Sequence, residues 1–464
     1  MNHIEGVLER IDADIDNSTD RLFDLLKIKS ISTDPAFKEE CRKAAEWLAR
    51  ELSEIGIKSS VRDTTGHPMV VGHSEADASK AGPHVLFYGH YDVQPVDPLE
   101  LWETDPFEPK IVTKPDGSKI IVARGSADDK GQLLTFVEAA RAWIAETGSL
   151  PLNVSVIFEG EEESGSPSLD AFLDANSKEL SCDLALICDT GMWNEETPAI
   201  TIMMRGLMGE QIDITASDRD LHSGHFGGAA ANPIHILSSI LAGLHDKTGK
   251  VTLPDFYDGV SEVPETVTAM WDGLGFTTEG FLGPVGLDVP AGENDRTALQ
   301  QIWSRPTLEI NGVWGGYTGA GFKTVIPSKA SAKVSCRLVG DQDPEKIRSS
   351  LRKYVEDNLP ADCSVEFHEH GSSASTHVDY TNPAVDHARN ALTEEWGKEA
   401  ALIGAGGSIP IVGDFKNKLS MDTLLIGFGL EDDQIHSPNE KYNFSSFHKG
   451  IRSWARILDA LAKA

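Results

Sequence analysis

Short apolar segments alternate with helical patterns in the first half of the chain, and this alternation limits the folds that it can adopt. Residues 84–89 (HVLFYG), 119–123 (KIIVA), 153–158 (NVSVIF) and 183–188 (DLALIC) have the length and apolar character of buried strands. A helical pattern at 132–148 separates the second strand from the third. Strand and helix alternating at this spacing are typical of a mostly parallel sheet covered by helices. We therefore predict an α/β fold.

The middle of the chain follows a different order. Its patterns predict strand, helix, strand, strand, helix and strand in the segments MGEQIDITAS, NPIHILSSILAGLHD, TLEINGVW, SKASAKVSCRLVG, DPEKIRSSLRKYVEDN and CSVEFHEHG. That order suits a split βαβ (ferredoxin-like) domain. Residues 250–306, rich in Gly, Pro and acids, are expected to form a long irregular insertion. We predict a catalytic-type domain in two parts, 1–205 and 381–464, with a second domain inserted at 206–380.

Length, charge and cysteine usage exclude several classes of protein. A chain of 464 residues is too long for one ordinary core, which agrees with two or three domains. The formal net charge of −32 would repel nucleic acid and anionic membranes, so neither is expected as a partner. No apolar run is long enough for a transmembrane helix, and the N-terminus is acidic and amphipathic. The five cysteines are scattered without a CxxC pair, so we expect neither disulfides nor a thiolate metal site. We therefore also expect a cytoplasmic location.

Residue types that bind metals follow the predicted strands, each just beyond a strand's carboxyl end. They are His90 with Asp92, Asp128 with Asp129, Glu162 with Glu163, Asp189, and His436. Each alone has a commoner explanation, such as a helix cap or a solvated loop. In parallel sheets, however, the carboxyl ends of the strands meet at one crevice, so all five positions can converge. Two histidines and several carboxylates without cysteine suit a hydrolytic site with two metal ions.

Other reaction classes lack their sequence signatures. A serine hydrolase would need a GxSxG turn between strand and helix, and this pattern is absent from the sequence. A nucleotide-binding protein would need GxGxxG after its first strand, whereas the glycine-rich segment 315–321 (GGYTGAG) has neither that pattern nor that place. A binding module without catalysis would be expected to lack a ligand or a base. The metal-dependent hydrolase therefore remains the leading interpretation.

Eight motifs give the sequence a family resemblance. They are HYDVQP (90–95), RGSADDKG (124–131), GEEESGS (160–166), LHSGHFGG (221–228), KTVIP (323–327), CRLVG (336–340), GGSIP (406–410) and HSPNEKYN (436–443). Together, and in this order, they resemble the aminoacylase and glutamate carboxypeptidase family of two-zinc metallopeptidases. The resemblance spans almost the whole chain and is closest to the carnosinase-like branch of cytosolic nonspecific dipeptidases.

This resemblance implies a role for each metal-binding position. One metal ion would be bound by His90 and Asp189, the other by Glu163 and His436, and Asp128 would bridge the two. The resemblance also implies a cis peptide bond between Asp128 and the residue that follows it. Zinc is the expected metal, with manganese and cobalt as alternatives, because these ligands accept all three.

The resemblance further implies a catalytic apparatus around the metals. Glu162 would be the general base that activates water, and Asp92 would orient the His90 ring. The inserted domain would be a lid through which a homodimer forms, with His222 acting in the partner's active site. Substrate contacts would come from Thr324, Arg337, Gly407 and Ser408.

The implied substrate is a dipeptide or similar small peptide with a free C-terminal carboxylate. Arg337 would bind that carboxylate, a task that suits a planar guanidinium. The sequence departs from the dipeptidases that it resembles at residues 404–408. It has GAGGS where they usually have REGGS, so Ala405 occupies the place of a Glu. Without that carboxylate, attraction for a free amino terminus is weaker by an amount on the order of 1 kcal/mol. An N-acyl-amino-acid amidohydrolase is therefore the alternative function.

Overall fold

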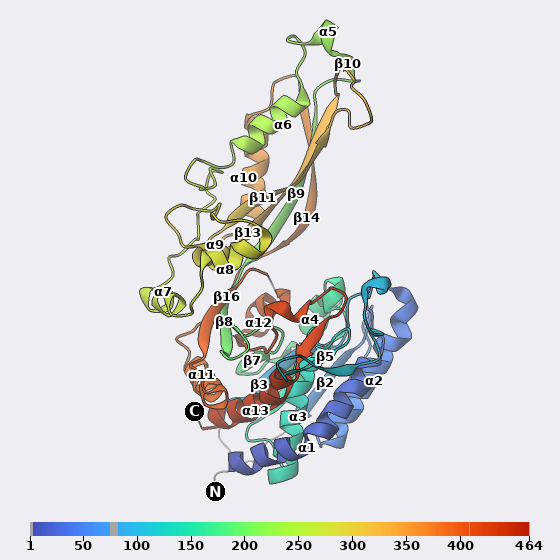
Figure 1. The fold of residues 1–464 in the computed structure, drawn as a ribbon, viewed down its shortest axis with the longest axis vertical. Helices are drawn as coiled ribbons and strands as arrows, with labels where there is room; N and C mark the ends of the chain where they lie inside the picture. Colours follow the sequence, from blue (N-terminus) through green and yellow to red (C-terminus); the bar gives the residue numbers. More distant parts are fainter. Residues whose placement is uncertain (1–2, 75–81, 408, 464) are drawn as a thin grey trace. The chain divides into compact units, whose positions relative to one another are not determined.

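The computed structural model describes residues 3–74, 82–407 and 409–463, which fold into two compact units (Figure 1). The first unit is built from three stretches of chain, Met1–Ile202, Val378–Ile403 and Asp414–Ala464. The second contains Met203–His377 and Gly404–Gly413. Each unit is described separately below. No helix among the described residues is both long enough and apolar enough to cross a membrane.

A nine-stranded sheet forms the centre of the first unit. Its four inner strands run parallel in the order β6 (Val154–Glu159), β3 (Val85–His90), β7 (Leu184–Ile187) and β17 (Asp422–Leu425). Antiparallel strands flank them, namely β2 (Met69–Ser74) and β1 (Lys58–Arg62) beyond β6, and β8 (Ala199–Met204) and β15 (Thr376–His377) beyond β17, while β16 (Ala401–Ala405) also pairs with β8. The predicted α/β fold with a mainly parallel sheet is confirmed.

Helices pack around this sheet. They are α1 (His3–Leu26), α2 (Lys38–Glu54), α3 (Lys130–Thr147), α4 (Leu169–Leu180), α11 (Pro383–Trp396), α12 (Pro410–Leu419) and α13 (Phe444–Leu461). Helix α3 packs against β3 on one side and against α1 and α13 on the others, so its first eleven residues are all buried. The Phe136 ring stacks on Phe87 of β3 at 3.8 Å, and Trp454 of α13 meets both rings edge-on. The start of α3 is thereby fixed relative to the end of β3.

One predicted strand does not belong to the central sheet. The segment KIIVA forms β5 (Lys119–Val122), which pairs antiparallel with β4 (Lys110–Thr113) and β18 (Lys441–Asn443) in a separate three-stranded sheet. The prediction that it joins the parallel strands is wrong. The turn between β4 and β5 contains Asp116 and Gly117, whose φ of 89° favours glycine, so a local hairpin forms instead of a long-range parallel pair.

The second unit contains the predicted split βαβ arrangement. Its four strands lie in the antiparallel order β11 (Thr307–Gly315), β13 (Lys329–Leu338), β9 (Gly206–Thr215) and β14 (Ser364–Ser373). Helices α6 (Pro233–Ala242) and α10 (Pro344–Asp357) pack on this sheet. Their apolar side chains, such as Leu351 of α10, share one core with alternate residues of the strands, such as Ile212 and Val334.

The remaining elements of the second unit are short. Strands β10 (Leu221–His222) and β12 (Val325–Ile326) pair with each other, and α5 (Ser223–Phe226) follows β10. Residues 250–306, expected to be irregular, contain the helices α7 (Glu265–Asp272), α8 (Thr278–Leu282) and α9 (Ala298–Trp303). Trp271 and Trp303 of this insertion pack edge-to-face at 5.1 Å, and both side chains are buried. A single 3₁₀ turn of this unit occurs at Gly283–Val285, and those of the first unit occur at Pro35–Phe37, Leu99–Leu101, Glu162–Ser164 and Glu431–Asp433.

Candidate dinuclear metal centre

His90 is the last residue of β3, and its side chain is fully buried. The Nδ1 atom lies 3.1 Å from the backbone oxygen of Asp92 and 3.4 Å from its carboxylate Oδ1. Because these oxygens can only accept, Nδ1 carries the proton and Nε2 is left as the free ligand atom. The Asp92 carboxylate also accepts hydrogen bonds from the backbone N–H groups of Glu162, at 3.3 Å, and Glu163, at 3.1 Å. Asp92 thus joins the end of β3 to the turn after β6.

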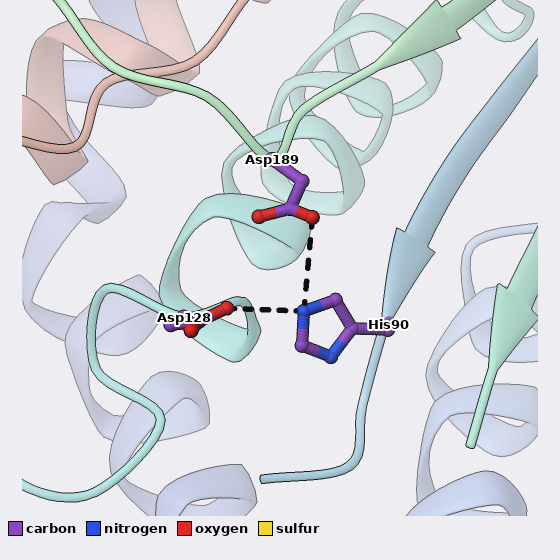
Figure 2. Close-up of side chains that lie close together, drawn as sticks. All are labelled: His90, Asp128 and Asp189. Carbon is purple, nitrogen blue, oxygen red and sulfur yellow. Dashed lines mark hydrogen bonds and ion pairs between the residues drawn. The ribbon is translucent and has the colours of Figure 1, made fainter. Parts of the chain in front are cut away.

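Asp128 and Asp189 converge on the Nε2 atom of His90 (Figure 2). The Oδ1 atom of Asp128 is 3.1 Å from Nε2, and the Oδ2 atom of Asp189, which follows β7, is 3.9 Å from it. The peptide bond between Asp128 and Asp129 is cis, as the resemblance implied. Asp128 reaches this edge of the sheet because it precedes α3, the helix that connects parallel strands β3 and β6.

A second group of ligands shares Asp128. Its other oxygen, Oδ2, lies 2.9 Å from Nε2 of His436, which in turn is 3.2 Å from Oε2 of Glu163. Gln94 donates a hydrogen bond of 2.7 Å to the same Glu163 oxygen. His436 is the most exposed of the five, with 54% of its side chain accessible, whereas Glu163 has 3%. One donor atom from each residue of either group lies within 4.8 Å of the others.

The electrostatics of the cluster indicate missing positive charge. Burial lowers the pKa of His90, but its hydrogen bonds to Asp128 and Asp92 outweigh this and raise the pKa well above its ordinary value. Hydrogen bonds to Asp128 and Glu163 raise the pKa of His436 to about 10. In both cases the neighbouring carboxylates favour a positive charge at the imidazole, and a bound metal ion would supply that charge in place of a proton.

The donor set fits two divalent cations. Burial raises the pKa of Asp189 well above its ordinary value and also raises that of Glu162, so neither carboxylate is fully compensated by its surroundings. Four carboxylates (Asp92, Asp128, Glu163 and Asp189) lie beside the two imidazoles, and two divalent ions would supply four positive charges. Oxygen and imidazole ligands of this kind suit zinc, manganese and cobalt. We conclude that the residues fit a dinuclear centre in which Asp128 belongs to both groups.

Two further residues of this site were not predicted from the sequence. The Glu440 carboxylate is fully buried and accepts hydrogen bonds from the backbone N–H groups of Gly125, Ala127 and Asp128, at 2.9, 2.9 and 3.1 Å. Arg124 donates to the same carboxylate at 2.8 Å. Both residues lie within the motifs RGSADDKG and HSPNEKYN, so the signal was an acid and an arginine inside motifs already singled out.

The remaining predicted residues lie in the second unit. His222 and Thr324 are neighbours, because β10 pairs with β12 and the backbone N–H of Ser223 donates to the Thr324 oxygen at 3.1 Å. Arg337 is on β13. Gly407 follows β16, and Ser408 lies outside the described residues.

Comparison with known proteins agrees with this chemistry. Residues 86–460 match the model of Peptidase family M20/M25/M40. The Cys-Gly metallodipeptidase DUG1 of Saccharomyces cerevisiae is 31% identical over 99% of this chain and 98% of its own length. The Beta-Ala-His dipeptidase of Homo sapiens is 28% identical over 99% of this chain and 93% of its own length.

A solved structure of the di-peptidase Dug1p from Saccharomyces cerevisiae covers all of this chain with a TM-score of 0.79 and 30% identity. A crystal structure of human carnosine dipeptidase 1 covers all of it with a TM-score of 0.78 and 27% identity. The family match covers most of the chain and the similarity to DUG1 covers almost all of it, and both indicate the same metallopeptidase family as the motifs. This chain belongs to Peptidase family M20/M25/M40 and is a metallopeptidase.

Proposed function

We propose that the protein is a dipeptidase that hydrolyses the amide bond of small peptides with a free C-terminal carboxylate, using two divalent metal ions. One observation carries the proposal: the two oxygens of Asp128 face two different imidazoles, and each imidazole has a further carboxylate beside it. His90 and Asp189 would hold one ion, and Glu163 and His436 the other. Such ions, when bound, lower the pKa of water from about 15.7 to about 7 and polarise the amide carbonyl.

Glu162 is proposed as the general base. It begins the 3₁₀ turn after β6, and two backbone N–H bonds to Asp92 fix that turn against His90. Burial, reinforced by the charge of Glu163, raises the pKa of Glu162. A carboxylate with a raised pKa takes a proton from water more readily and can return it to the leaving amine. Glu162 therefore accepts the proton first and donates it afterwards.

His222 is proposed to stabilise the negative charge that develops on the carbonyl oxygen. Its Nδ1 accepts a hydrogen bond of 3.0 Å from the backbone N–H of Gly224, so the ring proton is on Nε2. No described residue accepts a hydrogen bond from that N–H, so it is a donor of the kind that an oxyanion needs. Thr324, Arg337, Gly407 and Ser408 are proposed to contact substrate, with Arg337 binding its carboxylate.

The finer features belong to the same proposal. Zinc is the proposed metal, and a homodimer formed through the inserted lid domain, residues 206–380, is the proposed assembly, with His222 serving the partner's site. All five cysteines are free, which is usual in reducing compartments and supports a cytoplasmic location.

The proposal is tested with protein reconstituted in turn with zinc, manganese and cobalt. Hydrolysis of Ala-Leu, Cys-Gly and β-Ala-His is measured at equal metal occupancy. We expect turnover of at least one dipeptide that depends on two ions per subunit. Full activity of chelator-treated, metal-free protein would contradict the proposal.

An N-acyl-amino-acid amidohydrolase is the second candidate, and Ala405 is the observation that favours it. This residue ends β16 and supplies no carboxylate for a free amino terminus. We compare kcat/KM for Ala-Leu and N-acetyl-leucine in the natural protein and in Ala405→Glu. A hundredfold preference for Ala-Leu, about 2.7 kcal/mol, would support the dipeptidase, and the reverse preference would support the alternative. Ala405→Glu should shift the ratio toward Ala-Leu by several-fold.

A further inference from the structure

Arg205 lies between β8 and β9 in the second unit, beside the glycine-rich segment that follows β16. Its backbone N–H donates to the backbone oxygen of Ala405 at 3.3 Å. A Cβ atom added to Gly406 would lie 3.1 Å from Nη2 of Arg205, so the guanidinium is in close contact with this backbone. Arg205 is thus placed against the segment from which Gly407 is proposed to contact substrate.

The charge of Arg205 has no partner within the described chain. No described residue forms an ion pair or a side-chain hydrogen bond with its guanidinium, and the Nε atom is buried without an acceptor. Burial, together with the charge of Arg337, lowers the pKa of Arg205 to about 10. A half-buried guanidinium with unused donors is unfavourable unless an anion satisfies it.

Arg337 of β13 lies near Arg205, whose pKa it helps to lower. It pairs in register with Leu207 of β9, two residues after Arg205. The neighbouring residues Cys336 and Leu338 point into the core, so Arg337 points to the opposite face, and it also forms no ion pair with a described residue. Two unpaired guanidinium groups therefore lie close together.

Both groups line one pocket of about 530 Å³ in the second unit, together with Thr307, Asn311 and Ser335. The pocket contains a third arginine, Arg305, but its Nε is paired with Oε2 of the buried Glu293 at 2.9 Å. Glu309 also lines the pocket and offsets part of the Arg205 charge without forming an ion pair. Arg305 is paired with a carboxylate, whereas Arg205 and Arg337 are not paired with any described residue. This contrast indicates that the charges of Arg205 and Arg337 are available to a bound anion.

We propose that Arg205 is a second carboxylate-binding residue of the substrate site, acting beside Arg337 in this pocket. The inference rests on the proposed function, which assigns the substrate carboxylate to Arg337. Each guanidinium presents a planar fork of N–H donors that matches a carboxylate, and two forks can satisfy all of the lone pairs of its oxygens. Arg205 then determines specificity for substrates that carry an anion on the C-terminal residue.

The carboxylate can come from two sources, the C-terminal α-carboxylate or an acidic side chain of the same residue. The test therefore uses Ala-Leu, which has one carboxylate, and Ala-Glu, which has two. Arg205→Met removes the charge at similar length, and Arg205→Lys keeps the charge but loses the fork. Lys333→Met is the matched control, because Lys333 is an exposed cation on the same strand as Arg337 and does not line the pocket.

If Arg205 binds the α-carboxylate, Arg205→Met raises KM at least tenfold for both peptides, with kcat changed less than twofold. If it binds the acidic side chain, KM rises only for Ala-Glu. Arg205→Lys should give a smaller rise for the same peptides, and it carries the test if the Met variant does not fold. Unchanged KM for both peptides in a folded variant, or an equal rise in Lys333→Met, would overturn the inference.

Two readouts separate this inference from a structural role and from failure of the proposed function. The melting temperature of Arg205→Met should equal or exceed that of the natural protein, because an unpaired half-buried charge is removed. Calorimetric titration with L-leucine, L-glutamate and L-leucinamide needs no turnover. Arg205→Met should weaken binding of at least one of the two acids tenfold or more and leave L-leucinamide unchanged. If the natural protein hydrolyses no dipeptide but binds an acid more tightly than Arg205→Met does, only the proposed function is contradicted. If the natural protein and Arg205→Met bind L-leucine equally well and L-glutamate equally well, the inference is contradicted.

Discussion

The carboxylate of Glu440 accepts a hydrogen bond of 3.1 Å from the backbone N–H of Asp128, although 311 residues separate them in the sequence. The same carboxylate accepts from Gly125, Ala127 and Arg124. Glu440 therefore fixes the backbone of the loop that carries Asp128, the residue shared by the two groups of ligands. Glu440 contacts none of the proposed metal-binding atoms, but it positions Asp128, which belongs to both groups.

We predict that Glu440→Gln lowers both stability and metal affinity. The amide has a single acceptor oxygen for four donors and leaves Arg124 buried without its counter-charge, which should reduce the free energy of unfolding by about 3 kcal/mol or more. Looser placement of Asp128 should weaken metal binding by about 10- to 100-fold. Denaturant unfolding and competition with a chromophoric chelator measure the two effects. The exposed residue Glu431 offers a control in Glu431→Gln, and equal metal affinity in the two variants would contradict the prediction.

Asp128→Asn should weaken the binding of both metal ions, since each oxygen of Asp128 faces a different imidazole and the amide has only one oxygen and no charge. Asp189→Asn, by contrast, should affect one ion, because Asp189 approaches only His90. Elemental analysis after dialysis gives the number of bound ions per subunit. The same loss in the two variants would show that Asp128 is not shared.

Glu162→Gln should retain both metal ions but reduce kcat by about 10²- to 10⁴-fold, because a neutral amide cannot accept the proton from water. Glu163→Gln provides the comparison, since Glu163 and not Glu162 lies beside His436. It should lose one ion. If both variants lose metal equally, the division of roles within this acidic run is wrong.

Activity should be partly restored when His222→Ala protein is mixed with Glu162→Gln protein under conditions of subunit exchange. If His222 acts across a two-fold dimer, one of the two sites in the mixed dimer combines natural residues from both subunits. Recovery of up to half of the natural activity in that dimer is expected. Exchange proven by mass difference, with no recovery of activity, would place His222 in its own subunit's site.

Much of the fold and the metal cluster follows from local patterns. His90 ends a buried strand, Asp189 and Glu163 follow two others within four residues, and parallel strands bring their carboxyl ends together whatever the details of packing. That regularity makes a cluster of metal-binding residue types visible in the sequence. The order of elements in the inserted unit is equally visible, because each of its strands and helices has its own apolar period.

Residues that depend on long-range pairing were harder to predict. The apolar run at 119–123 cannot indicate which sheet it joins, and it joined β4 and β18 rather than β3. Asp128 reached the expected edge all the same, because α3 rather than a strand positions it. Glu440 and Arg205 differ little from surface residues in the sequence, since their significance arises from partners, or the lack of them, that only the folded chain reveals.

The placement of β17 between β7 and β8 has a consequence for how the protein is made on the ribosome. The first ligand group, His90, Asp128 and Asp189, is complete once residue 189 has been synthesised, but the second must wait for His436. Until residues 422–425 emerge, β7 and β8 cannot be joined into one sheet, because the strand that separates them does not yet exist. The nascent chain therefore carries an open sheet and half of a metal site through the synthesis of more than two hundred residues. Because domains tend to fold as they emerge, N-terminal first, the inserted unit has time to fold before the centre that it interrupts can close.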